Sequence, residues 1–198
     1  MKLRFRPTAA AITFFILFFG GYALYRLVRA SQWQIPEEFV QSRSEGALMA
    51  QMIVSLSGEV SNELQRINEL DKDRRYEEAL TAVTELATKN GKMREEAVNL
   101  SRELERMTKS LSEIRSPEAR DLALEAINNR LALIIRLISY NDGIMRLLGE
   151  LRLHFVGASG STDQVSVIIN RINLEVAAIN DFNRRATEAM DRFDRATK

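Results

Sequence analysis

The sequence is poor in three residue types that often define small proteins: it has no cysteine, three prolines and one histidine among 198 residues. Without cysteine the chain forms no disulfide and offers no thiol nucleophile or thiolate metal ligand. The scarcity of proline, the strongest helix breaker, permits long helices over nearly the whole chain. The lone His154 needs a carboxylate or hydroxyl partner to act as a base or metal ligand, and the sequence identifies none. We therefore interpret His154 as a partly buried surface residue.

The chain also lacks a charge excess and a catalytic motif. Its 28 basic residues nearly balance its 27 acidic ones, giving a net charge of +1, and the two signs are interspersed. This pattern argues against a nucleic-acid partner, which a basic patch would indicate. The sequence contains no nucleophile elbow, no HExxH motif and no phosphate-binding loop. We therefore expect no enzymatic activity, no cofactor and no metal site.

Long apolar runs are equally scarce, with one exception near the start of the chain. The stretch PTAAAITFFILFFGGYALY, residues 7–25, contains no charged residue. As a helix it is long enough to cross the hydrocarbon core of a bilayer, which is about 30 Å thick. The sequence therefore predicts a transmembrane helix over residues 7–29, with a short basic tail over 1–6 before it and a linker over 30–35 after it.

The residues that flank this run predict its orientation. Basic residues are more numerous before the run, and the α-amino group adds to them, so the positive-inside rule places the N-terminus in the cytoplasm. Beyond the run, arginine heads extend toward water and a tryptophan ring favours the far interface. We expect a single-pass membrane protein whose C-terminal domain is extracytoplasmic. The flanking residues are Lys2, Arg4, Arg6, Arg26, Arg29 and Trp33.

A cleaved secretory signal is the competing interpretation of this segment. Val28-Arg29-Ala30 before Ser31 has the small-residue pattern of a cleavage site. Two arginines, however, stand between the apolar run and that site, and the run is longer than the usual signal core. We therefore favour a retained anchor.

From residue 36 onward, apolar residues recur every three or four positions, which is typical of helices with one buried face. Turn signals divide this pattern into four stretches and predict helices over about 36–71, 73–115, 117–156 and 162–197. Because the connections are short, successive helices must fold back on one another. The sequence therefore predicts an all-α protein in which a long, coiled-coil-like, antiparallel (up-down-up-down) four-helix bundle over 36–198 follows the transmembrane helix.

Residues near the turns predict how the helices begin. Ser116 is expected to cap the third helix, with Pro117 at its first position. Either Asp71 or Asp73 is expected to cap the second helix. The acidic residues here do not fit a calcium loop, because Arg75 stands where an oxygen ligand belongs. Residues 73–80 also resemble the second helix of a tetratricopeptide unit, but no 34-residue repeat accompanies them.

An asparagine interrupts the apolar face of both the second and the third predicted helix. Asn90 and Asn141 each occupy a position of the apolar stripe, and each has a glycine close behind it. The apolar pattern continues through both, which predicts unbroken helices. Both lie about 25 residues from the turn at 115–116, so an antiparallel hairpin brings them to one level. We expect a paired, buried polar layer that fixes the register, with a weak ligand pocket beside Tyr140 as the alternative.

Two helix faces carry further patterns. Ser42, Gly46 and Ala50 share one face at four-residue spacing, which predicts close helix packing. On the outer face of the last helix, four acids each precede a base by four residues, which predicts a solvated face with ion pairs inside the helix. These pairs join residues 181 and 185, 188 and 192, 191 and 195, and 194 and 198.

These observations favour a structural or interaction protein that presents a helical bundle on the extracytoplasmic face. The expected partners are the lipid bilayer and either another protein or further copies of the chain; a small-molecule ligand is not expected. The alternative is a ligand-sensing bundle, which resembles in outline the periplasmic four-helix domains of chemotaxis receptors. Since the chain reaches Lys198 without a second apolar span, such a sensor would signal through a partner subunit.

Overall fold

The computed structural model describes residues 35–157 and 162–197. Within these ranges the chain is helical and contains no strand, so the all-α prediction is confirmed for the described residues. A short 3-10 turn, η1 (Leu111–Glu113), extends the second of the four α-helices. The observed ends lie within a few residues of the expected ones. The α-helices are α2 (Glu37–Lys72), α3 (Tyr76–Ser110), α4 (Pro117–Phe155) and α5 (Thr162–Ala196).

The expected membrane anchor lies outside the described residues. This applies to the tail over 1–6, to the transmembrane helix over 7–29 and to the linker over 30–35 except for Ile35. Within 35–157 and 162–197, no helix combines the length and the apolar character that a bilayer crossing needs. The flanking residues Lys2, Arg4, Arg6, Arg26, Arg29 and Trp33 also lie outside the described part.

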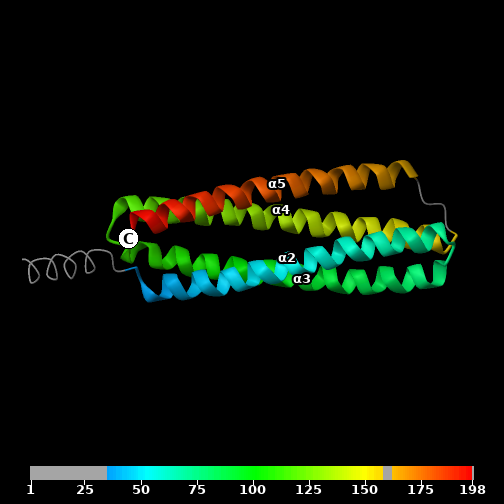
Figure 1. Ribbon diagram of the computed structural model, residues 1–198, viewed down its shortest axis with the longest axis horizontal. Helices are drawn as coiled ribbons and strands as arrows, with labels where there is room; N and C mark the ends of the chain where they lie inside the picture. The colour runs from blue at the N-terminus through cyan, green and yellow to red at the C-terminus, as the bar shows by residue number, and fades with distance from the viewer. Residues whose placement is uncertain (1–34, 158–161, 198) are drawn as a thin grey trace, which may run out of the picture.

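The four helices lie side by side and alternate in direction (Figure 1). α2 packs along α3, α4 packs along α5, and α3 packs along α4. One end of the bundle, called here the Phe39 end, holds the start of α2, the turn between α3 and α4, and the end of α5. The other end holds the turn between α2 and α3 and is called the Asp71 end. The described helices thus have the predicted up-down-up-down order.

All four helices contribute to one continuous core. The apolar stripes seen in the sequence supply most of it, because a helix repeats every 3.6 residues and a stripe at that spacing faces one side. α3 runs through Asn90 and α4 runs through Asn141 without a break. The largest fully buried apolar side chains are Phe39, Val60, Ile67, Leu86, Met93, Leu104, Met107, Ile127, Ile144 and Phe193.

The predicted helix starts are partly correct. The Ser116 side chain accepts a hydrogen bond from the backbone N–H of Ala119 at 3.2 Å, and Pro117 is the first residue of α4, as predicted. The prediction that Asp71 or Asp73 caps α3 is wrong. α2 continues through Lys72, and the chain reverses at Arg74, whose φ of 58° is left-handed. The N-cap of α3 is therefore Arg75, which makes no side-chain capping bond.

The small-residue face of α2 packs closely against α3. Ser42 and Gly46 are buried, and a Cβ placed on Gly46 would lie 3.2 Å from Leu100 Cδ1. This matches the close packing expected from the spacing of Ser42, Gly46 and Ala50. A larger side chain at position 46 would separate the two helices.

The outer face of α5 differs from its prediction. The expected pair of Asp181 and Arg185 forms, at 2.6 Å. Arg192, however, binds Glu125 of α4 at 2.6 Å, and Asp194 binds an arginine of α2. This face is therefore not wholly solvated, because long charged side chains reach across to the neighbouring helices as well as along their own.

Candidate functional site

α2 and α5 contact each other at the Phe39 end of the bundle. The rings of Phe39 and Phe193 are both fully buried, with centroids 5.3 Å apart. One turn further along, the Arg43 guanidinium donates two hydrogen bonds to the Asp194 carboxylate, at 2.6 and 2.7 Å. These bonds are the main reason that the pKa of Arg43 is raised. An aromatic contact and a two-bond ion pair thus close this end.

At the Asp71 end the two helices stand apart, with a groove between them. Among the described side chains of α5 between residues 164 and 176, only Ile172 and Glu175 are buried. Ile169 and Val176 keep 42% and 39% of their surface exposed. The expectation that the last apolar stripe is covered by the bundle itself is therefore wrong for Val176. α5 packs mainly along α4, and the described residues of α2 and α5 have no comparable contact.

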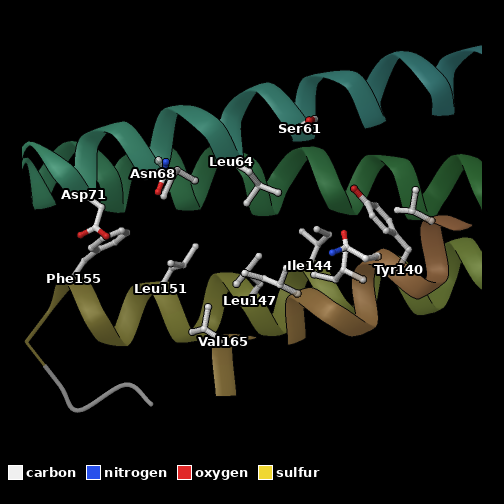
Figure 2. Close-up of a pocket in the computed structure, with 15 residues that line it drawn as sticks. Ser61, Leu64, Asn68, Asp71, Tyr140, Ile144, Leu147, Leu151, Phe155 and Val165 are labelled. Atoms are coloured by element: carbon white, nitrogen blue, oxygen red, sulfur yellow. The ribbon is translucent and has the colours of Figure 1, made fainter. Parts of the chain in front are cut away.

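The separation leaves an apolar groove between α2, α4 and α5, with a volume of about 570 Å³. Figure 2 shows side chains of α2 and α4 that point toward one another across it, with Val165 of α5 beside them. We call this feature the α2–α5 groove. Its lining residues are Ser61, Leu64, Ile67, Asn68, Asp71, Tyr140, Ile144, Leu147, Leu151, Phe155, Val165, Ile169, Ile172, Asn173 and Val176.

The mouth of the groove carries a contact between a carboxylate and a histidine that the sequence did not reveal. Asp71 Oδ1 of α2 lies 3.1 Å from His154 Nε2 of α4, and both side chains are partly exposed. The His154 ring also meets the Tyr76 ring edge to face, with centroids 6.2 Å apart. No group of three acidic or histidine side chains suitable for a metal occurs in the described ranges. This contact links the C-terminal ends of α2 and α4. It also gives Asp71, the one carboxylate in the groove lining, a partner within the chain.

Tyr140 lies at the inner end of the groove and is almost completely buried (Figure 2). Burial raises the pKa of its phenol, and a hydrogen bond with Ser57 of α2 acts in the opposite direction. Since the net shift is upward from an ordinary value near 10, the hydroxyl is protonated at neutral pH. The inner end of the groove is therefore uncharged.

The structure brings Asn90 and Asn141 together at one level of the α3–α4 hairpin. The Asn90 Nδ2 atom donates to the backbone carbonyl of Asn141 at 3.0 Å, and the two residues are 2% and 1% exposed. The expected pairing of the two side-chain amides does not form, because both amide atoms of Asn141 lack a hydrogen-bond partner. At this level Arg94 also binds Asp142 at 2.6 Å. Neither asparagine lines the α2–α5 groove.

This asymmetry predicts different effects of alanine at the two asparagines. Asn90→Ala removes a buried hydrogen bond, whereas Asn141→Ala removes an amide that bonds to nothing. The gain in helix propensity is the same in both, so it cancels in the comparison. We expect the free energy of unfolding of the Asn141→Ala protein to exceed that of the Asn90→Ala protein by about 1 kcal/mol. Chemical unfolding followed by circular dichroism measures the difference, and the reverse order would contradict this assignment of the bonds.

The arrangement of the groove suits binding rather than chemistry. Its walls are aliphatic and aromatic, and Ser61, Asn68 and Asn173 carry no charge. Its one carboxylate, Asp71, contacts His154. The sequence signal at this site is Ile169, an apolar residue that lies beside the main stripe of α5 and lines the groove, but it does not show that the face is open. A comparison of the chain with protein families, with curated proteins and with solved structures finds no match.

Proposed function

We propose that this chain is a membrane-anchored, non-catalytic helical bundle that acts as an interaction module on the extracytoplasmic face. The charge-free run over residues 7–25 and its basic flanks support the anchor and its orientation. The observation that carries the interaction role is the open α2–α5 groove. Apolar surface left in water favours association, by roughly 25 cal/mol for each Å² that a partner covers.

The shape of the groove suits a helix as the bound element. Its α2 wall extends from Ser61 to Asp71, which at ~1.5 Å per residue gives a length of about 15 Å, or three helical turns. An amphipathic helix that lies in an apolar groove is a common mode of protein recognition. Ser61, Asn68 and Asn173 lie along the rim and are exposed, so they can hydrogen-bond to water when the groove is unoccupied.

Site-directed crosslinking in native membranes tests this function. Because the chain has no cysteine, Asn68→Cys places a single thiol on the rim of the groove. Glu95→Cys places the control thiol on an exposed position of α3. A thiol-coupled photocrosslinker should yield a protein adduct from position 68 and not from 95, and the adduct should disappear when Val176→Glu is added. Equal yields from the two positions, or none, would argue against docking at the groove.

A ligand-sensing bundle is the second candidate, and the volume of the groove favours it. About 570 Å³ falls within the range of roughly 300–1,000 Å³ that small-molecule sites occupy. A compound that binds only the folded state stabilises it by about 2.7 kcal/mol at a hundred times its Kd. Thermal unfolding of the full chain against a panel of apolar metabolites would reveal such a gain. If none of them raises the melting temperature, the sensing function loses its support.

A further inference from the structure

The chemistry of the groove also identifies its occupant, if the groove is the docking site proposed above. We propose that the occupant is a second copy of this chain, with the α5 helices of the two copies packed in parallel along their open halves. The α5 helix is suited to this because it forms one wall of the groove and presents an uncovered apolar edge at the same time.

The open edge of α5 has the spacing of a two-helix seam. Val165, Ile169, Ile172 and Val176 all line the groove and follow one another in steps of four, three and four residues. Alternating steps of three and four keep side chains on the side of a helix that faces its partner. Of these four, Ile169 and Val176 project furthest from the bundle, with 42% and 39% of their surface exposed.

The charges along α5 favour an identical partner over a charged one. Between residues 164 and 176 the helix carries only Arg171 and Glu175, and Glu175 is 8% exposed and lies 3.6 Å from Arg136 of α4. The other half of α5, from residue 181 to 195, is densely charged. An uncharged seam meets its own copy without leaving a buried charge unpaired. A net charge of +1 adds little repulsion between copies.

Symmetry and the proposed anchor determine the relative direction of the two copies. A two-fold axis parallel to the bundle places α5 against α5 and makes the same surface serve on both sides. Each chain enters its bundle at the Phe39 end, directly after the proposed membrane segment at 7–29. Two copies held by one membrane therefore stand side by side in the same direction, which brings residue 169 near residue 169 and residue 176 near residue 176.

Disulfide trapping tests this arrangement in the full-length, membrane-bound protein. Ile169→Cys and Val176→Cys each place the only thiol of the chain on the seam. Leu174→Cys is the matched control, because it is more exposed, at 72%, and lies about 140–160° around the helix from both. Under a mild oxidant we expect the seam variants to form disulfide-linked dimers in at least about ten-fold higher yield than the control. An Ile169→Glu/Val176→Glu variant, with normal helicity by circular dichroism, should no longer form dimers with a lysine-reactive crosslinker.

Each contrary outcome has a distinct meaning. Equal yields from the seam and control positions would overturn the proposed seam. Crosslinking between Ile169→Cys and Val176→Cys chains in mixed membranes, without same-residue dimers, would overturn the parallel direction. Capture of a different protein at position 169 would overturn the second copy as occupant while leaving the docking function standing. Absence of any adduct at positions 68, 169 and 176 would overturn both the second copy as occupant and the docking function of the groove.

Discussion

Phe193→Ala is expected to lower the free energy of unfolding by about 3–5 kcal/mol, the usual cost of removing a fully buried phenylalanine ring. The Phe193 ring is 0% exposed and packs on Phe39, with ring centroids 5.3 Å apart. It lies at the end of the bundle where α2 and α5 meet. α2 and α5 have little other direct contact, so the loss of this ring removes most of what joins them.

Phe182→Ala is the control on the same helix. Phe182 is only half-buried, and the Arg185 guanidinium covers its ring at 5.8 Å. Its truncation should therefore cost less than half as much as that of Phe193. Denaturant unfolding of the full chain in detergent, monitored by circular dichroism, measures the free energy of unfolding of the two variants. Equal losses would contradict the view that the Phe39–Phe193 contact closes the bundle.

Gly143→Ala is expected to lower the free energy of unfolding by about 1–3 kcal/mol, although alanine is the better helix former. A Cβ on Gly143 would lie 2.9 Å from Cγ1 of Ile172, which is too close without a shift. Ile172 is a buried, β-branched residue of α5 with little freedom to change rotamer. The added methyl group should therefore push α5 away from α4 and enlarge the α2–α5 groove, which Ile172 also lines.

Gly149→Ala should have the opposite effect. This glycine lies on the same helix, and a Cβ placed there meets no atom within 4 Å. The substitution then contributes only helix propensity, a gain of about 1 kcal/mol. Thermal or denaturant unfolding of the two variants in parallel gives the contrast directly. A gain in stability from both would mean that α4 and α5 lie further apart at Gly143 than the structure places them.

The sequence predicts the helices well because helix periodicity and capping are local properties. The spacing of apolar residues locates α2 to α5, and Ser116 with Pro117 locates the start of α4. The level of Asn90 and Asn141 also follows from local information, since it depends only on the distance of each from one turn. The bond between them was not predictable, because either amide end and either backbone carbonyl offered a plausible partner.

The groove was not predictable, because an apolar stripe shows which side of a helix avoids water and not which neighbour covers it. The stripe of α5 continues evenly from Val165 to Phe193, yet it is best covered toward Phe193, whereas Val176 is exposed and Val165 is only half-buried. The partners of charged side chains were not predictable either, because they depend on which helices lie next to each other. His154 meets Asp71, 83 residues earlier, only because α2 and α4 run in the same direction at this alignment.

The most direct test of an anchored extracytoplasmic module is thiol accessibility in sealed membrane vesicles, followed by carbonate extraction. Lys92→Cys places the only thiol of the chain on an exposed position of α3. In right-side-out vesicles we expect a membrane-impermeant maleimide to label this thiol, and the labelled chain to stay with the carbonate-washed membranes. Labelling only after the vesicles are lysed, or release of the full-length chain into the carbonate supernatant, would contradict the proposed placement.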